Sequence, residues 1–298
     1  MRILIADDDP ISRRLLEATL VRLGHEVVAV ADGTEAITAL LDPDGPQLAI
    51  LDWMMPGADG LTVCRTIRQR PTPYVYVIVL TSRDRQADMI ESLDAEADDF
   101  LTKPCDAVEL RARLRSGERV ITLQQNLLSA QAALQYEASH DQLTGLWNRG
   151  MILEHLKNEI SRSRRKTASA AVIMADIDHF KLVNDTHGHR TGDVVLHEVG
   201  QRMRGVLRDY DKLGRYGGEE FLLVIAGADA AGARLVAERV RVAVASQPIR
   251  DGTLEVSVSL SLGVACTAVV GFEPDVLIQV ADEALYQAKR RGRNRVEG

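Results

Sequence analysis

The sequence predicts two different domains joined by a long helix: an α/β domain with a doubly wound, parallel, five-stranded sheet, and an α+β domain with a mainly antiparallel sheet. Three observations lead to this prediction. Over residues 1–106, short unbroken apolar runs alternate with helical patterns. A helical stretch without proline then covers 106–138, and beyond it helical patterns mix with strands. At 298 residues the chain is long enough for two domains of ordinary size.

The first domain, predicted for residues 1–120, contains strands at 2–6, 26–30, 47–51, 74–80 and 98–102. Most of these runs are apolar at every position, which is typical of strands buried on both faces of a parallel sheet. Helical spacing lies between them, as at Ile11, Leu15, Leu16 and Leu20. This alternation indicates a doubly wound sheet, with functional groups at the carboxyl ends of its strands.

The stretch 106–138 is predicted to be one linker helix that continues the last helix of the first domain. It carries a narrow apolar stripe that Gly117 weakens locally, formed by Val120, Leu123, Leu127, Ala130 and Leu134. A helix with such a stripe cannot bury it alone. We expect it to pair with a second copy of itself, and the alternative is that it packs back onto one domain.

The second domain is predicted for residues 139–298. Strands are expected at 169–178, 221–227 and 253–265, and helices at 191–207, 229–245 and 274–290. The last strand alternates cleanly, with serines on one face and six apolar residues on the other: Leu254, Val256, Val258, Leu260, Leu262 and Val264. Helices against one face of a mainly antiparallel sheet describe an α+β fold.

The composition excludes several classes of protein. Hydrophobic residues make up 46% and charged residues 27%, as in ordinary globular proteins. Aromatic residues are only 4% and the net charge is −7, so we expect neither nucleic-acid nor membrane binding by the whole molecule. No apolar run approaches the ~18–20 residues that cross a bilayer, and the amino terminus turns acidic too early for a signal peptide.

The cysteines add a prediction about the compartment. Cys64, Cys105 and Cys266 are scattered and have no CxxC spacing, which disfavours a zinc site and favours reducing conditions. Together with the absence of a signal peptide, this predicts a cytoplasmic protein.

Charged residues collect where the strands of the first domain end. Asp7, Asp8 and Asp9 follow the first strand, Asp52 ends the third, and Thr81 and Lys103 follow the fourth and fifth. Because these ends converge, the carboxylates repel one another unless a hard divalent cation such as Mg²⁺ neutralises them. Metal, lysine, hydroxyl and carboxylate together suit phosphoryl transfer. A single Asp at one of these positions would be explained as a helix cap, but helix capping does not explain the whole set at matching strand ends.

The first domain resembles the receiver domain of bacterial response regulators in "ILIADDDP", "LAILDWMMPGADG", "VLTS" and "DDFLTKP". The resemblance implies that Asp52 is the phosphoacceptor and that Asp7, Asp8 and Asp52 hold a metal ion. It also implies phosphate contacts from Thr81 and Lys103, a rotamer switch at Phe100, and a cis Lys103–Pro104 peptide. A histidine kinase or phosphotransfer protein would be the upstream partner.

A second set of carboxylates lies in the second domain. Asp176 and Asp178 end a predicted buried strand, and "RYGGEEF" places Glu219 and Glu220 after two glycines. If the glycine hairpin lies on a neighbouring strand, Asp176 meets both glutamates, which predicts a divalent metal that holds nucleotide phosphates. Taken alone, the hairpin would be an ordinary exposed turn.

Other residues point to the ligand. Gly217 and Gly218 lack Cβ atoms, so the backbone can approach it, and Lys181, Lys289 and Arg293 could supply cations for phosphate. A carboxylate and an amide, here Asp193 and Asn184, can bind the two N–H donors and the carbonyl of guanine, and adenine lacks that donor pair. The alternatives are a basic helix end, a loop Asn and an N-cap Asp.

Residues 139–295 resemble the GGDEF family, the diguanylate cyclases that make cyclic di-GMP from GTP. The likeness lies in "HDQLTGLWNR", "DIDHFKLVNDTHGHRTGD", "RYGGEEF", "VSLSLGVA" and "ADEALYQAKRRGRN". It implies a nucleotidyl-cyclase-like domain with a ferredoxin-like core, which uses Mg²⁺ or Mn²⁺. His179 departs from the aromatic residue that many members carry.

The resemblance also implies roles for single residues. The implied metal ligands are Asp176, the carbonyl of Ile177, Glu219 and Glu220. The implied catalytic residues are Glu219, which would help to deprotonate the ribose 3′-hydroxyl, Glu220 and Lys181. Guanine would contact Asn184 and Asp193, and the phosphates would contact Lys181, Lys289 and Arg293. The remaining implied substrate-binding residues are Phe180, His189, Gly217 and Gly218.

The mechanism that follows is a condensation of two GTP molecules, one on each of two facing half-sites, into cyclic di-GMP and two pyrophosphates. The chain should therefore act as a homodimer that phosphorylation of the receiver activates. Arg208 and Asp211 match the family's inhibitory RxxD product site, to which Arg239 would contribute. The main alternative is a non-catalytic receptor for cyclic di-GMP. A different cyclic dinucleotide and a DNA-binding regulator are less favoured, because Asp193 is present and no helix-turn-helix is evident.

Overall fold

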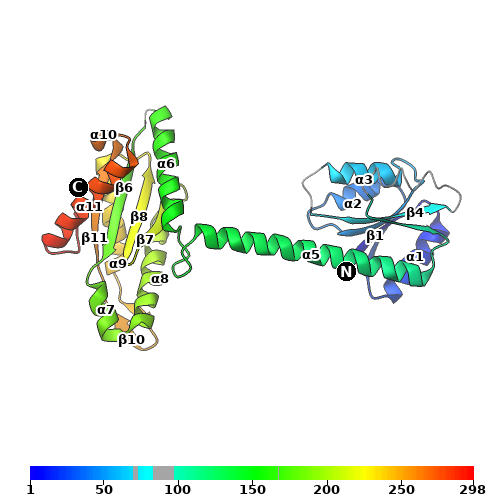
Figure 1. Ribbon diagram of the computed structural model, residues 1–298, viewed down its shortest axis with the longest axis horizontal. Coiled ribbons are helices and arrows are strands. Elements are labelled where there is room, and N and C mark those ends of the chain that lie inside the picture. Colours follow the sequence, from blue (N-terminus) through cyan, green and yellow to red (C-terminus); the bar gives the residue numbers. More distant parts are fainter. Residues whose placement is uncertain (70–72, 83–96, 167) are drawn as a thin grey trace. The chain divides into compact units, whose positions relative to one another are not determined.

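The computed structural model describes residues 1–69, 73–82, 97–166 and 168–298. The chain divides into two compact units, Met1–Gln131 and Ala132–Gly298, and each is described by itself (Figure 1).

The N-terminal unit is a parallel sheet with strand order β2-β1-β3-β4-β5, which confirms the doubly wound α/β prediction. Its strands are β1 (Arg2–Ala6), β2 (Glu26–Val30), β3 (Leu48–Asp52), β4 (Tyr76–Ser82) and β5 (Asp99–Lys103). Among the residues that the structure describes, its helices are α1 (Pro10–Arg22), α2 (Gly33–Leu40), α3 (Gly60–Arg68) and the first part of α5 (Ala107–Ser139).

Successive residues of the central strands face two separate cores. Ile3 and Ile5 of β1 join a cluster with α1 and α5, whereas Leu4 and Ala6 join a second cluster with α2 and α3. Because both faces are covered, the strands need apolar residues at every position. The edge strand β2 differs, since all of its residues are exposed or only half-buried, and the prediction that it is buried on both faces is wrong.

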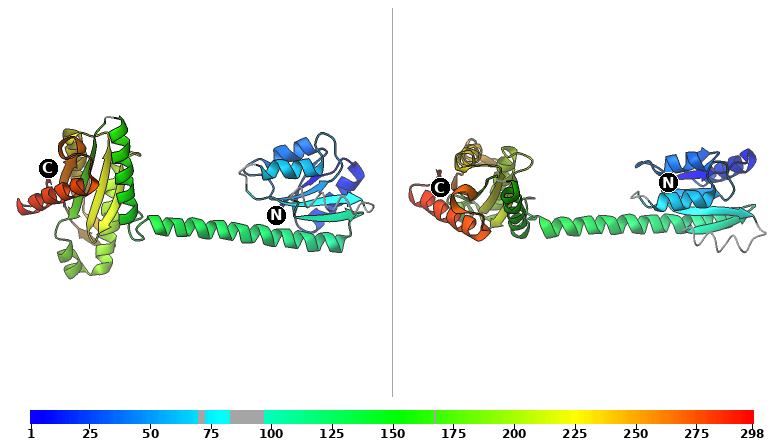
Figure 2. Two further views of the ribbon diagram at one scale, coloured as in Figure 1. Left: turned by 45° about the horizontal axis from the view of Figure 1, so that its top comes forward. Right: turned by 90° about the horizontal axis from the view of Figure 1, so that it is seen from above.

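Helix α5 has two parts with different surroundings, although Figures 1 and 2 show it as one uninterrupted helix. Its first part packs on the sheet, where Val120 borders the core. Gly117 permits this contact, because a Cβ there would lie 2.7 Å from Cδ1 of Tyr76. Val120 therefore belongs to the packing of the N-terminal unit, which corrects its assignment to the apolar stripe. From Leu123 onward the leucines of the stripe are exposed.

The C-terminal unit has a five-stranded sheet with order β12-β11-β6-β8-β7. Its strands are β6 (Ala170–Ile177), β7 (Lys212–Gly217), β8 (Glu220–Ala226), β11 (Leu260–Cys266) and β12 (Val296–Glu297), and β9 (Ile249–Asp251) pairs with β10 (Leu254–Val256) in a small hairpin. Its helices are α6 (Arg149–Lys166), α7 (Phe180–His187), α8 (His189–Gly205), α9 (Ala230–Ala245), α10 (Thr267–Val270) and α11 (Pro274–Arg290).

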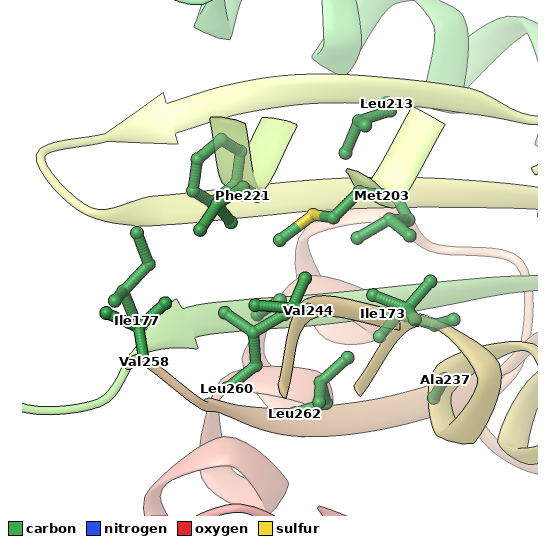
Figure 3. Packing of buried hydrophobic residues seen from close by; sticks show 14 of the residues in the cluster. Ile173, Ile177, Met203, Leu213, Phe221, Ala237, Val244, Val258, Leu260 and Leu262 are labelled. Atoms are coloured by element: carbon green, nitrogen blue, oxygen red, sulfur yellow. The ribbon is translucent and has the colours of Figure 1, made fainter. Parts of the chain in front are cut away.

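Strands β6, β7, β8 and β11 form the ferredoxin-like core that the resemblance implies. They pair antiparallel in the order β11-β6-β8-β7, with helices after β6 and after β8, as in a β-α-β-β-α-β unit. The sheet carries helices on both faces, so the expectation of one covered face is wrong. Helices α7, α8 and α9 cover one face, where Phe221 and Leu260 pack (Figure 3), and α6 and α11 cover the other.

The strand predicted at 253–265 is two strands, β10 and β11, separated by residues 257–259. Every residue of β11 is buried, so its serine does not face solvent as the alternation predicts. The physical reason is a hydrogen bond: the Ser261 hydroxyl donates to Oδ1 of Asp178 at 2.6 Å, which satisfies a polar group inside the fold.

An aromatic stack closes the junction between α5 and the C-terminal unit. Tyr136 stacks on His140 at 4.1 Å between ring centroids, His140 contacts Trp147 at 4.3 Å, and Trp147 contacts His155 at 4.7 Å. The backbone N–H of Trp147 donates to the carbonyl of Leu213, and the carbonyl of Trp147 accepts from the N–H of Arg215. Trp147 therefore lies beside Gly214 of β7. The first residues after α5 are thereby joined to the sheet.

Candidate functional site

The carboxyl ends of the N-terminal strands bring the predicted acidic residues together. Carboxylate oxygens of Asp7, Asp8 and Asp52 all lie within 4.8 Å of one another. The Lys103 ammonium lies 2.8 Å from Oδ2 of Asp7 and 2.8 Å from Oδ2 of Asp52. Asp9 stands apart, because it caps α1 by accepting from the backbone N–H groups of the first turn.

Burial sets the electrostatics of this cluster. Asp7 is fully buried and accepts a hydrogen bond from the Ser12 hydroxyl at 2.7 Å. Burial raises the pKa of Asp52, and Lys103 opposes that rise. Burial alone would lower the pKa of Lys103, but its hydrogen bonds to Asp52 and Asp7 together outweigh burial and raise the pKa. One ammonium thus neutralises only part of the negative charge of the three carboxylates, which fits a divalent cation at this rim.

The remaining receiver residues lie on the two strands next to this rim. Thr81 of β4 is in register with Thr102 of β5, and Phe100 is half-buried on β5. The Lys103–Pro104 peptide is cis, as the resemblance implies.

In the C-terminal unit, antiparallel pairing of β6 and β8 brings the second acidic set together. Asp176 pairs with Glu220 across the two strands, and the backbone N–H of Ile177 donates to the carbonyl of Glu219 at 3.3 Å. The Lys289 ammonium of α11 lies 2.7 Å from Oδ2 of Asp176. Asp176 and Glu220 therefore lie at one end of the sheet next to the turn residue Glu219, and Lys289 contacts Asp176 there.

Two of these carboxylates, Asp176 and Glu220, resist ionisation. Burial raises the pKa of Asp176 to about 6, with further contributions from Glu219 and Glu220, and Lys289 opposes the rise. Burial also raises the pKa of Glu220. Such a site gains from a divalent cation, because the cation stabilises carboxylates that burial destabilises.

The glycine turn leaves open space beside these carboxylates. A Cβ added to Gly217 or Gly218 would meet no atom within 4 Å. Gly218 has φ of +53°, a conformation that favours glycine, and the strand pairing shifts between Arg215 and Gly217. The glycines therefore form the hairpin turn between β7 and β8 that the sequence predicts, and the turn has room for a ligand.

Asp178 has a structural role rather than a place in the acidic set. Its carboxylate accepts from the hydroxyls of Ser259 and Ser261 at 2.6 Å each and from the backbone N–H of Asn294 at 3.0 Å. These bonds hold the loop after α11, in which Arg293 and Asn294 both have positive φ. Arg293 is exposed on this loop.

The residues predicted to read the base lie on α7 and α8, which Gly188 separates. Asn184 is part of α7 and not of a loop, and Asp193 is exposed within α8 and not at its cap, so both simple alternatives are wrong. Gly192 makes room for the amide, because a Cβ there would lie 2.0 Å from Oδ1 of Asn184. The amide therefore lies against α8 one residue before Asp193.

Three other predicted substrate residues have distinct positions. Lys181 and His189 are exposed in the first turns of α7 and α8. The Phe180 side chain is 7% exposed and belongs to the hydrophobic core, so it supports α7 from inside. Its side chain is consequently a packing group.

Two of the predicted inhibitory residues, Arg208 and Asp211, line a pocket of about 230 Å³. Asp211 is buried and accepts from the backbone N–H of Arg208, and Arg204 and Lys212 also line the pocket. Arg239 of α9 donates to the carbonyl of Val206, two residues before Arg208. The structure thus brings Arg239 to the same turn within one chain.

One contact beside the glycine turn was not predicted from the sequence. The Arg215 guanidinium lies 3.1 Å from Asp141, at the start of the C-terminal unit, and donates to the carbonyl of Gly218 at 2.9 Å. Hydrogen bonds from Thr144 and the charge of Arg215 outweigh burial and lower the pKa of Asp141. In the sequence, the only sign of this contact is an arginine two residues before the glycines, because its partner Asp141 lies 74 residues away.

These two sites define the class of protein: a response regulator whose second domain has the fold and the acidic turn of a nucleotidyl cyclase. Residues 3–115 match the response regulator receiver domain, and residues 138–295 match the GGDEF domain of diguanylate cyclases. The chain belongs to the GGDEF family and is a diguanylate cyclase with an N-terminal receiver domain, as the sequence predicts.

Similar proteins agree with this membership. Response regulator PleD from Caulobacter vibrioides is 29% identical over 449 aligned residues, which cover 100% of this chain and 99% of that protein. Diguanylate cyclase DosC from Escherichia coli is 40% identical over 182 residues, covering 60% of this chain and 38% of that protein.

Among solved structures, the coiled coil and GGDEF domain of DgcB from Caulobacter crescentus, in complex with c-di-GMP, matches with a TM-score of 0.56 at 30% identity. That match covers 63% of this chain and 98% of the other. Diguanylate cyclase SiaD from Pseudomonas aeruginosa, in complex with its activator SiaC, matches with a TM-score of 0.52 at 41% identity, covering 63% and 72%. In the part of this chain that the structure describes, no helix is long and apolar enough to cross a membrane.

Proposed function

We propose that this protein is a phosphorylation-activated homodimer that condenses two GTP molecules into cyclic di-GMP and two pyrophosphates, and that its product inhibits it. The observation that carries the proposal is the acidic set at the glycine turn. Asp176 contacts Lys289 and pairs with Glu220 there, and Glu219 follows two glycines that leave open space at the turn.

In the proposed reaction, the 3′-oxygen of one GTP attacks the α-phosphorus of the other. The bond from that phosphorus to the bridging oxygen breaks, pyrophosphate leaves, and Glu219 accepts the proton of the 3′-hydroxyl. The 3′-oxygen of the second nucleotide then attacks the α-phosphorus of the first, a second pyrophosphate leaves, and the ring closes. Each domain holds one GTP, so two copies must face each other.

A divalent cation, Mg²⁺ or Mn²⁺, would be held by Asp176, Glu219, Glu220 and the carbonyl of Ile177, where it would neutralise phosphate charge. The donor set fits such an ion, since all of these ligands are oxygens and burial raises the pKa of Asp176. Lys289, already at 2.7 Å from Asp176, adds a cation for the phosphates.

The base would be read by Asn184 and Asp193. Their positions support this role: the amide lies against α8 next to Asp193, and the carboxylate is exposed. An acceptor carboxylate suits the N–H donors of guanine and rejects adenine, which lacks that pair. Lys181 and Arg293 are exposed, and with His189 they are proposed to contact the nucleotide.

In the receiver domain, Asp52 is the proposed phosphoacceptor, Asp7 and Asp8 hold the metal with it, and a histidine kinase or phosphotransfer protein is the donor. Lys103, at 2.8 Å from Asp52, would contact the phosphoryl oxygens. Thr81 and Phe100 are proposed to respond to phosphorylation.

Two features support the homodimer and the feedback. Leu123, Leu127 and Leu134 are 61%, 58% and 64% exposed along α5, an arrangement that a second copy could bury. The pocket that contains Arg208 and Asp211 carries several cations, which suits the phosphates of cyclic di-GMP, and Arg239 lies at the same turn.

The test incubates the full-length protein with GTP and Mg²⁺, with and without beryllofluoride as a phosphoryl mimic, and identifies the product by mass. We expect cyclic di-GMP, made faster with beryllofluoride, and no product from ATP. Binding of cyclic di-GMP without synthesis under either condition would instead identify a non-catalytic receptor.

The two control variants separate regulation from catalysis. Asp52→Asn should remove the effect of beryllofluoride and keep basal synthesis, and Arg208→Ala should relieve product inhibition and keep the initial rate. Continued activation of the first variant or unchanged inhibition of the second would refute the corresponding role.

A further inference from the structure

A basic pocket lies on the receiver domain between the end of α1 and the first part of α5. It has a volume of about 360 Å³ and is lined by three arginines, Arg22, Arg111 and Arg115, together with His25 and Glu118. The arginines on α5 are one turn apart, so both side chains lie on the face of that helix that borders α1. The proposed phosphorylation and cyclase chemistry uses none of these residues.

The arginines of this pocket have no ion-pair or hydrogen-bond partner among the residues that the structure describes. Arg113 on the same helix shows that α5 pairs its arginines where carboxylates are in reach, because it contacts Asp99 at 3.1 Å and Glu109 at 3.6 Å. The pocket therefore gathers positive charge in a protein whose net charge is −7.

His25 adds an independent observation. Its Nδ1 atom is buried and makes no hydrogen bond within the described structure, although its side chain lines the pocket. The carboxylate of Glu118 lies 3.7 Å from that atom, too far for a hydrogen bond. A buried polar atom without a partner is costly, and a ligand in this pocket would lie beside the imidazole that carries the atom.

We propose that this pocket binds a phosphate-bearing small anion. Guanidinium groups present N–H donors in a planar fork that matches the oxygens of a phosphate. Three of them around one concave site outweigh the single carboxylate of Glu118. The ligand joins the end of α1 to α5, and it stabilises the receiver domain by binding only the folded state.

The experiment titrates inorganic phosphate, pyrophosphate and GTP separately into the full-length protein without divalent metal, at constant ionic strength. The readout is the NMR signal of the His25 imidazole, which lies in this pocket and in neither of the other sites. The signal is assigned by its loss in His25→Gln. We expect a saturable shift, and the three arms show whether free phosphate, pyrophosphate or a nucleotide is the preferred source.

Two double variants test the arginines. Arg111→Gln with Arg115→Gln should weaken binding by at least about tenfold, since each removes charge-assisted hydrogen bonds. Arg14→Gln with Arg119→Gln removes the same charge from exposed positions of α1 and α5 outside the pocket and should change binding by less than about twofold. No saturable shift in the natural protein, or equal weakening by both pairs, would overturn the proposal.

Discussion

At the scale of single residues, two aspartates two positions apart have opposite roles. Asp176 is buried beside two glutamates with one lysine for compensation, whereas Asp178 is fully hydrogen-bonded to two serines and a backbone N–H. Both end the same apolar run in the sequence. Their difference depends on which strand lies on each side, and local sequence does not encode that.

This contrast can be measured. Asp176→Asn should lower cyclase activity by about 10²-fold or more, because it removes a carboxylate from the metal set. It should also weaken Mn²⁺ binding, measured by calorimetry with a non-hydrolysable GTP analogue. Asp178→Asn should keep Mn²⁺ affinity but lower the free energy of unfolding by about 1–3 kcal/mol. Equal Mn²⁺ affinity in the Asp176 variant and the natural protein would contradict the assignment.

His155 provides a prediction about pH. Burial and the charge of Lys212 lower its pKa, and its Nε2 is buried without a hydrogen bond in the described structure. The unfolded chain, with an ordinary pKa of about 6.5, binds the proton more readily than the folded domain. Stability contributed by neutral His155 is therefore present above that pH and is lost as pH falls below it.

Replacing His155 by Phe keeps a ring against Trp147 and removes the titration. We expect the melting temperature of the cyclase domain to fall less between pH 7.5 and 5.5 in this variant than in the natural protein, measured by calorimetry. Parallel pH profiles for the two proteins would show that His155 does not contribute.

At the scale of elements, helix α5 depends on one glycine. In Gly117→Ala the new Cβ would lie 2.7 Å from Tyr76 and 3.0 Å from Leu48, and we expect a loss of about 1–3 kcal/mol in the unfolding of the receiver domain. Gly205→Ala is the matched control in α8, because its Cβ would meet no atom within 4 Å. That change should be neutral or stabilising by up to about 1 kcal/mol in urea titrations.

The glycine turn depends on Arg215, which connects Asp141 to the carbonyl of Gly218. Arg215→Gln should lower kcat several-fold and leave the KM for GTP nearly unchanged, because it loosens the turn without touching the predicted base contacts. Arg149→Gln is a control, since that exposed arginine stacks on Tyr216 beside the same turn. An equal effect of both changes on kcat would argue against a specific role for Arg215.

The elements also show where prediction from sequence succeeds. Strands such as β1 and β3 are recognised because burial on both faces leaves every position apolar, and the acidic rim follows because parallel strands end together. The β10–β11 boundary was missed because serines inside a core resemble serines facing water until Asp178 is found beside them. The contact from Asp141 to Arg215 was missed because it joins distant segments.

At the scale of the whole molecule, the exposed stripe of α5 makes the oligomeric state testable. Leu127→Glu should weaken self-association at least about tenfold and lower activity in parallel, because it places a charge in the apolar seam. Sedimentation velocity measures the first effect and product formation the second. Asn126→Glu adds the same charge one residue away, outside the stripe, and should leave both unchanged. A dimeric Leu127→Glu variant would contradict the proposed seam.

The aromatic stack at the junction has a consequence for how such proteins can be assembled. Tyr136, His140, Trp147 and His155 all belong to the unit that begins at Ala132. The contacts that fix the end of the helix therefore lie within the cyclase domain and involve no residue of the receiver domain. A gene fusion that supplies a different sensor upstream of residue 132, in the same helical phase, would keep these contacts.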